Sequence, residues 1–341
     1  MSGLGYAVAQ AILHNSKNLC QSNWRTIRNL KSLVYDGKTN PAPVFFNPEV
    51  QALLKSLTRV NNEKVFRRKK LGTQKLSDPE YKFMTDEELQ ESLKEAENRA
   101  NELLQIPPVI QVADVTTKVL ARDNALQGLE SSRMVFTDIT YGLKDCDRLI
   151  VVREPDGTLQ EAEWAVRQRI IQAYFPRPGK LIKPPKMFEG QYLEALLNKN
   201  EYEFILDRAC TQFEPDDPDY QKIVSATYEH INENNKFDLL RSTRHFGSLV
   251  FYLAWHKKVD NLLLELIETL HIKEAKELID LYSIMHKIEF DNKSDVDAVK
   301  DFIKKEADKK GSLELAMQAY EDVIAQKLQL KKEIDAAHGI K

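Results

Sequence analysis

The sequence is poor in cysteine, has no glycine- or proline-rich repeats, and lacks long apolar runs. Its three cysteines stand far apart without CxxC spacing, so neither a disulfide framework nor a cysteine-based zinc site is indicated. Twelve glycines and 13 prolines in 341 residues are too few for a low-complexity chain. No stretch approaches the roughly 18 uninterrupted apolar residues of a membrane helix. We therefore expect a soluble protein without a membrane span.

Motifs of the common enzyme classes are also missing. The sequence contains no GxGxxG, GxxxxGK[ST], HExxH or GxSxG pattern, so dinucleotide, P-loop, zinc-protease and hydrolase sites lack their basic signals. His256, His271 and His286 recur at equal intervals, but this spacing offers no close pair of metal ligands. Packing or helix-end roles are favoured for them. We expect no catalytic residue, no metal, no cofactor and no small-molecule substrate.

Basic and acidic residues are nearly equal in number over the whole chain, but some segments contain charged residues of one sign only. The 49 basic and 52 acidic residues give a net charge of -3, which does not suit a general polyanion binder. Residues 1–35 nevertheless contain four basic residues and no acidic one, mixed with Ser, Asn and apolar residues. This composition is typical of a mitochondrial transit peptide, predicted here for residues 1–36, and a matrix location follows. A disordered tail is the alternative.

Residues 37–130 are predicted to form an N-terminal arm with two amphipathic helices. Asn47 can cap the first helix with Pro48 in its first turn, and Thr85 with Glu88 has the pattern of a capping box before the second. A basic run lies between the helices, and it is either a phosphate-binding arm or a solvated charge cluster. It consists of Arg67, Arg68, Lys69 and Lys70.

Residues 131–190 combine strand, turn and helix signals. The alternation from Val135 to Tyr141 predicts a half-buried strand, and the β-branched run Leu149–Val152 predicts its partner. Pro155–Gly157 provides the turn chemistry of a small antiparallel β-meander, in which glycine adopts a positive φ at low cost. Glu161–Phe175 is predicted to be helical.

The region from Trp164 to Phe188 has six basic residues and no acidic one. Its prolines are expected to keep the loop after residue 175 extended, so that it could follow a phosphate backbone. Arg167 falls within the apolar arc of the preceding helix and is less suited to such contact than Arg169, on the opposite side. A solvated surface loop is the alternative. The candidate phosphate contacts are Arg169, Arg177, Lys180, Lys183 and Lys186.

Residues 191–341 are predicted to form an irregular C-terminal helical array, because helical periodicity continues without a fixed repeat length. The segment Ser248–Trp255 is apolar nearly all round and should be its buried centre. Arg241 and Arg244 precede this segment, where cations oppose the helix dipole unless an anion is present. A phosphate of a partner or a carboxylate of the chain itself would serve equally as this anion. A later apolar stripe, Leu313–Leu328, is expected to be capped by Ser312.

Six phrases, in one order and at characteristic intervals, carry a resemblance to a known family. They are VFTDITY, IVVREPDGTL, QAYFP, FEPDD, YEHI and FDLLRSTRHFG. Together they resemble the mitochondrial small ribosomal subunit protein twenty-two family, best between Arg133 and Lys258. His245 stands where this family leads us to expect tyrosine.

The resemblance implies a mainly α (α+β) structural constituent of the mitochondrial ribosome. Its expected role is to support mitochondrial translation and subunit assembly by bridging small-subunit rRNA and neighbouring small-subunit ribosomal proteins. No catalytic residue carries over from the family. The alternatives are a helical adaptor of the mitochondrial matrix outside the ribosome and an uncharacterised matrix enzyme.

Overall fold

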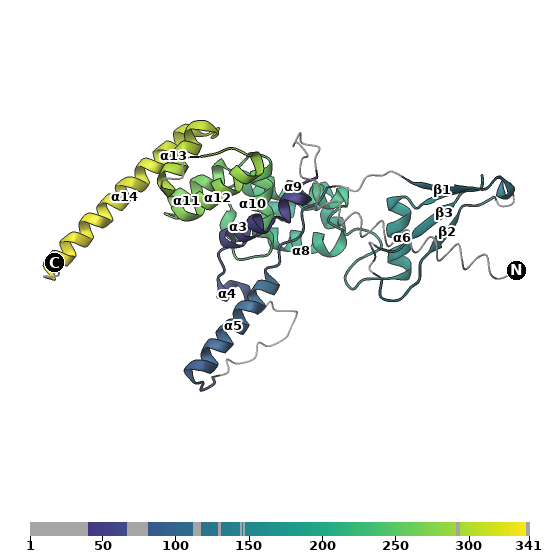
Figure 1. Cartoon of the computed structure of the whole chain (residues 1–341), viewed down its shortest axis with the longest axis horizontal. Coiled ribbons are helices and arrows are strands. Elements are labelled where there is room, and N and C mark those ends of the chain that lie inside the picture. The colour runs from purple at the N-terminus through teal and green to yellow at the C-terminus, as the bar shows by residue number, and fades with distance from the viewer. Residues whose placement is uncertain are drawn as a thin grey trace. The chain divides into compact units, whose positions relative to one another are not determined.

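The computed structural model describes residues 40–66, 81–111, 117–128, 131–143, 145, 147–290 and 294–338 (Figure 1). It is mainly helical with one small antiparallel sheet, which confirms the predicted fold class. Two predicted features, the transit peptide at residues 1–36 and the basic run Arg67–Lys70, lie outside the described residues.

The chain forms two compact units, each assembled from separate stretches of sequence. A sheet unit contains Ile110–Phe188 and Thr211–Asp219. A helical unit contains Val44–Val109, Glu189–Cys210 and Tyr220–Lys341. Helices from before the sheet therefore belong to the same unit as the C-terminal helices.

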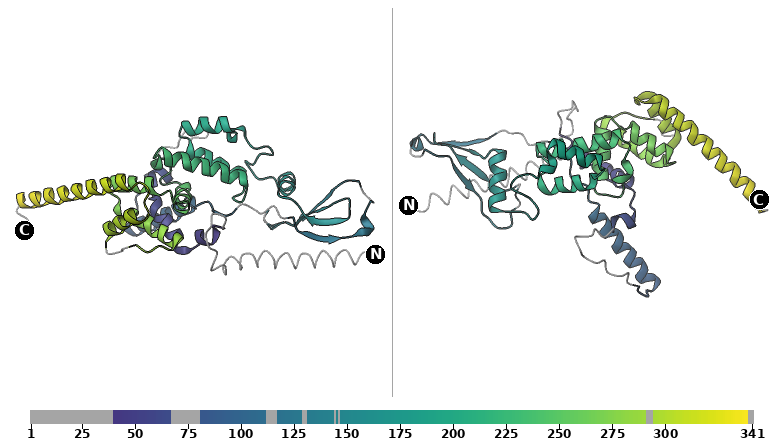
Figure 2. Two further views of the ribbon diagram at one scale, coloured as in Figure 1. Left: turned by 90° about the horizontal axis from the view of Figure 1, so that it is seen from above. Right: turned by 180° about the vertical axis from the view of Figure 1, so that it is seen from behind.

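Figure 2 shows the sheet from two further sides. It has four short strands in the order β1-β4-β3-β2, and every neighbouring pair is antiparallel. The strands are β1 (Val119–Arg122), β2 (Met134–Thr137), β3 (Ile150–Arg153) and β4 (Thr158–Glu161). Strands β2, β3 and β4 are the expected meander. Strand β1, which pairs with β4, was not predicted, because all four of its residues are exposed and no apolar alternation marks it.

Both predicted strands are present, but the alternation predicted from Val135 onward is not seen in the burial of β2, whereas burial alternates in β3. Ile150 and Val152 are buried in β3, whereas Val135 and Phe136 are both exposed in the edge strand β2. The prediction that the strand continues to Tyr141 was wrong. The Asp138 carboxylate accepts hydrogen bonds from the backbone N–H and hydroxyl of Thr140, at 2.9 and 2.6 Å, and turns the chain there.

Arg148 fixes the segment that follows β2. Its guanidinium donates to the carbonyl oxygens of Asp138, Thr140 and Leu143 at 3.0–3.1 Å. The same group lies 3.6 Å from the ring centre of Phe175, the residue that ends helix α6 (Trp164–Tyr174). One buried cation thus joins the start of β3 to the end of α6.

The helical unit is built from most of the remaining helices. These are α2 (Ala42–Phe45, at the boundary of the units), α3 (Pro48–Thr58), α4 (Asn62–Val65), α5 (Asp86–Leu103), α7 (Gly190–Asn198), α8 (Tyr202–Gln212), α9 (Pro218–Glu233), α10 (His245–Trp255), α11 (Asp260–Glu268), α12 (Ile272–His286), α13 (Asp295–Lys305) and α14 (Lys310–Ala337). The two caps predicted for the N-terminal arm are confirmed. Asn47 accepts from the Glu49 N–H, and Thr85 forms a complete capping box with Glu88. No helix in the described part of the chain is long and apolar enough to cross a membrane.

Helix α10 is the buried centre of this unit, as predicted, since nine of its residues from His245 to Ala254 are buried. Helix α3 packs directly against α10 and α12. Val50 and Leu54 of α3 have no exposed surface, and the ring centre of Phe45 lies 5.1 Å from that of Phe251 in an edge-to-face contact. An early segment of the chain therefore completes the core of the later helices.

Arg241 is the polar centre of the same core. Its side chain is 6% exposed and lies 2.6 Å from Glu265 of α11 and 3.5 Å from Glu274 of α12. It also donates to the Leu57 carbonyl oxygen of α3 at 3.3 Å and lies over the ring of Phe246 in α10. One buried guanidinium therefore contacts four helices.

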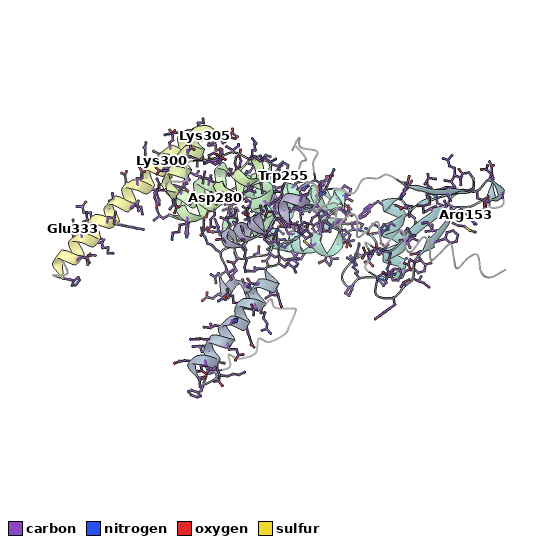
Figure 3. The ribbon with its side chains drawn as sticks, in the orientation of Figure 1. Arg153, Trp255, Asp280, Lys300, Lys305 and Glu333 are labelled. Atoms are coloured by element: carbon purple, nitrogen blue, oxygen red, sulfur yellow. The ribbon has the colours of Figure 1, made fainter. Side chains whose placement is uncertain are left out.

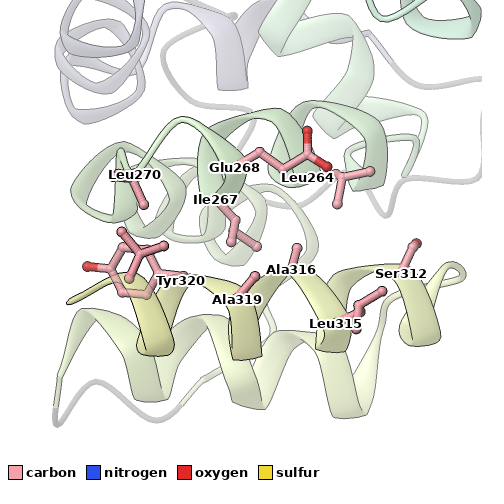
Figure 4. Close-up of a pocket in the computed structure, with 10 residues that line it drawn as sticks. Leu264, Ile267, Glu268, Leu270, Ser312, Leu315, Ala316, Ala319 and Tyr320 are labelled. Atoms are coloured by element: carbon pink, nitrogen blue, oxygen red, sulfur yellow. The ribbon is translucent and has the colours of Figure 1, made fainter. Parts of the chain in front are cut away.

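Helix α14 packs on α11 through its first half only. Leu313 and Met317 are buried, and a cavity of about 390 Å³ lies beside them, between Ile267 of α11, Leu270 just after that helix and Ala319 of α14 (Figure 4). The predicted cap at Ser312 was wrong: α14 begins at Lys310, and the Ser312 hydroxyl donates to the Lys309 carbonyl oxygen at 3.0 Å.

Substituting Gly157→Ala should destabilise the sheet unit strongly. Gly157 has a φ of +83°, and an added Cβ would lie 2.1 Å from the backbone oxygen of Asp123. We expect the free energy of unfolding to fall by about 3 kcal/mol, from left-handed strain plus the clash. Urea unfolding followed by Trp164 fluorescence measures it. Gly142→Ala, at φ +82° with nothing within 4 Å, is the matched control and should cost only about 1 kcal/mol. Equal losses would contradict the packing explanation.

Substituting Arg241→Met should lower the free energy of unfolding of the helical unit by about 3 kcal/mol, because Glu265 and Glu274 lose their buried partner. Trp255, whose ring stacks on Phe251, reports this transition in urea. The control Lys258→Met removes an exposed ion pair to Glu229 and should cost less than about 1 kcal/mol. Similar midpoints for the two variants would show that Arg241 does not hold the core.

Candidate nucleic-acid interface

The basic loop after α6 is bent, not extended as predicted. The Lys180 N–H donates to the Arg177 carbonyl oxygen at 3.2 Å, and Gly179 between them has a φ of +83°. A second turn begins where the Phe188 N–H donates to the Pro185 carbonyl oxygen at 3.2 Å. The prolines restrict φ as expected, but the glycine after Pro178 reverses the chain.

The loop is fixed to the last residue of α8 and to the segment that follows this helix. The buried amide of Gln212 makes two hydrogen bonds with the backbone of Leu181, accepting at 3.0 Å and donating at 2.8 Å. The rings of Phe188 and Phe213 lie 5.2 Å apart at the other end of the loop. These contacts hold the loop in one conformation.

Two of the four loop cations are engaged within the protein. Arg177 lies 2.5 Å from a carboxylate oxygen of Asp145 and 2.8 Å from one of Glu214. The Lys180 ammonium group donates to the Gln168 side chain at 3.0 Å and lies 3.5 Å from Glu214. Their positive charge is therefore largely compensated before any partner binds.

The other two loop cations are directed to solvent. Lys183 and Lys186 are exposed, and neither forms an ion pair within the described residues. Arg169 on α6 is exposed in the same way, as its place opposite the apolar arc predicted. Leu181 and Ile182, next to Lys183, are also exposed. Arg169, Lys183 and Lys186 are thus the predicted contacts of this unit that remain available to a partner.

A cavity of about 470 Å³ lies under the loop but does not suit a phosphate. Arg167 and Arg177 line it together with three carboxylates, those of Asp145, Glu214 and Asp216. Burial raises the pKa of the Asp216 carboxyl above its ordinary value. With three carboxyl groups against two guanidinium groups, the lining has no net positive charge to hold a phosphate.

Arg244, the neighbour of the buried Arg241, is satisfied by a carboxylate of the chain. Its guanidinium donates to one oxygen of Asp207 in α8, at 2.7 and 3.0 Å. His245 is fully buried and its Nε2 atom lies 2.9 Å from the same oxygen. Burial lowers the pKa of His245, against the opposing effect of Asp207. The sequence left either a phosphate or an internal carboxylate as the partner of Arg241 and Arg244. In the structure, both guanidinium groups pair with internal carboxylates.

The three evenly spaced histidines have separate local partners. His256 packs on the ring of Tyr252, His271 contacts the Thr269 hydroxyl, and His286 lies 2.8 Å from the Ala254 carbonyl oxygen. No group of three or more potential metal-binding side chains occurs within the described ranges.

The anchoring residues of the loop were missed from the sequence. Asp145 and Glu214 lie far from Arg177 along the chain, and carboxylates in turns are too common to mark them as its partners. Gln212 has no distinguishing pattern either, since only the fold brings it to Leu181. The sequence shows that the loop is basic in a chain that is acidic overall. It does not show that Asp145 and Glu214 neutralise part of this positive charge.

Comparison with known proteins places the chain in one family. The profile of the family described as "Mitochondrial 28S ribosomal protein S22" matches residues 43–287. The mouse (Mus musculus) "Small ribosomal subunit protein mS22" is 37% identical over 289 residues, covering 83% of this chain and 80% of the relative. The cattle (Bos taurus) protein of the same name is 38% identical over 290 residues, covering 82% and 79%. The resemblance inferred from the sequence is confirmed, and the chain belongs to the mitochondrial ribosomal protein S22 family.

Proposed function

We propose that this protein is a structural constituent of the mitochondrial small ribosomal subunit in the matrix. The observation that carries the proposal is its similarity to small ribosomal subunit proteins along more than four-fifths of its length. Its expected role is to support mitochondrial translation and subunit assembly by bridging rRNA and neighbouring small-subunit proteins. The role is structural rather than catalytic, in keeping with the family.

Lys183 and Lys186, with Arg169, are the proposed rRNA contacts of the sheet unit. Phosphate contacts need accessible, uncompensated cations, and these three side chains meet that requirement in the described structure. Gln212 and the Arg177–Glu214 pair order the loop in advance, which lowers the entropy cost of binding. Arg177 and Lys180 therefore act by positioning the loop.

The basic run Arg67–Lys70 is a second proposed rRNA contact, on the basis of its charge alone. Arg241 and Arg244 are set aside, because their guanidinium groups already have carboxylate partners in the helical unit. Contacts of this kind position a protein on phosphates without reading bases, so the proposed binding depends on salt and little on sequence.

The chain should sediment with the small ribosomal subunit in a sucrose gradient of mitochondrial lysate. Ribonuclease treatment before the gradient should release it, because the proposed assembly depends on rRNA. Immunoblotting of the fractions measures both results. A peak near the top of the gradient that ribonuclease does not change would indicate a matrix adaptor outside the ribosome and contradict the proposal.

The double variant Lys183→Glu/Lys186→Glu should incorporate into the small subunit at least about tenfold less than the unmodified chain at about 150 mM salt, because two phosphate contacts become repulsive. The matched control Lys331→Glu/Lys332→Glu makes the same charge change on exposed residues of α14. Co-sedimentation and urea unfolding are measured for both variants. Equal incorporation of the two folded proteins would remove Lys183 and Lys186 from the interface.

A further inference from the structure

Helix α5 presents an apolar stripe that the described protein leaves uncovered. At about 100° per residue, the apolar side chains of α5 fall within an arc of about 80°. Leu89, Leu93 and Leu103 of the stripe are exposed, with Leu93 reaching 59%. Ala100 is the single buried residue of this helix. An exposed leucine needs no explanation by itself, but three on one face of a helix mark an interaction surface.

The stripe continues into the segment before the helix. Tyr81, Phe83 and Met84 are exposed immediately before the capping box of Thr85. Aromatic rings and methionine are the residue types enriched where protein interfaces form. The capping box starts α5 directly after this segment, so the exposed aromatic residues and the first leucine of the helix are close together along the chain.

The helix is anchored at its C-terminal end. The Ile106 side chain packs against Gly247 of α10, where an added Cβ would lie 2.5 Å from it. The Pro107 carbonyl oxygen accepts a hydrogen bond from Ser248 at 3.1 Å. Helix α5 contacts α4 and otherwise projects from its unit (Figure 1), with side chains on all sides (Figure 3). Its anchored end therefore holds the stripe in place without covering it.

The charge around the stripe limits the kind of partner. Helix α5 carries seven acidic residues and only two basic ones, Lys94 and Arg99. Asp86 and Glu97 border the stripe on one side, and Glu88 and Glu95 lie on the other, where Arg99 also falls. A phosphate backbone would be repelled by this face, and so would the α5 face of a second copy.

We propose that Tyr81–Met84 and α5 dock into an apolar groove of a basic neighbouring protein. The leucines at successive helical turns fill the groove, and the bordering carboxylates pair with Lys and Arg side chains on its rim, the arrangement of a helix-in-groove complex. The helix is about 27 Å long, enough for several anchor positions. The identification of the partner as a small-subunit protein rests on the proposed function, whereas its basic, apolar character follows from α5 itself.

Two surfaces of this protein are thus assigned different kinds of partner. The loop of Lys183 and Lys186 faces rRNA, whereas α5 faces protein. A photo-crosslinking experiment can separate these cases, because a benzophenone side chain reports the macromolecule that touches it.

The test uses the full chain carrying Leu93→p-benzoylphenylalanine. The control is Asn98→p-benzoylphenylalanine, at an exposed position of the same helix about 180° from the centre of the stripe. After irradiation of isolated small subunits, the probe at 93 should crosslink to a peptide of one protein that is rich in Lys and Arg. The probe at 98 should give at least about tenfold less product. Adding Leu89→Ala/Leu103→Ala to the probe at 93 should lower its yield at least about fivefold, while Glu87→Ala/Lys94→Ala should not.

Crosslinking of the probe at 93 to rRNA, to an acidic protein or to nothing would overturn the inference, as would equal yields from positions 93 and 98. The proposed function is tested separately by whether the chain sediments with the small subunit. If it does not, the same crosslink is read in the fraction that contains the chain, and a basic protein partner there supports the docking surface alone. All substituted side chains are exposed or half-buried, and urea unfolding confirms that each variant is folded.

Discussion

The buried guanidinium of Arg241 is the constraint on which the helical unit depends. Removing a charge from water is costly, and the cost is offset only when carboxylates and carbonyl oxygens surround it in good geometry. Here those groups come from α3, α11 and α12, with the Phe246 ring of α10 on the remaining side. The four helices must therefore assemble together. As a result, α3 packs in one core with α10, α11 and α12, although these helices lie far beyond it in sequence.

The same physics divides the cations of the sheet unit into two groups. Arg148 and Arg177 are engaged by carbonyl and carboxylate oxygens of their own unit, where they fix the turns around β3 and the basic loop. Lys183 and Lys186 are carried on that fixed framework and remain uncompensated. Internal ion pairs thus shape the surface, and the flexible lysines at its edge are available for binding. An acidic chain can present a local positive surface in this way.

Local features of the fold could be predicted from the sequence, because their partners lie within a few residues. Asn47, the Thr85–Glu88 capping box and the turn at Gly157 are of this kind. Strand β1 could not be predicted, since its exposed residues follow no pattern and only β4 holds it. The loop cations were recognisable from charge contrast, but the partners of Arg177 come from separate segments. Assigning Arg177 to structure and Lys183 to binding required the tertiary fold.

The place of α3 in the core also bears on how the protein is made. Arg241 lies 184 positions after Leu57 in the sequence, and the two residues are the ends of one hydrogen bond in the helical unit. The N-terminal part of the chain is synthesised first, so the apolar face of α3 stays uncovered until α10 and α12 have been made. Such long-range contacts slow folding and leave aggregation-prone surface exposed in the interval. The nascent chain is therefore a natural client for chaperones, and fragments that end before α10 cannot close this core.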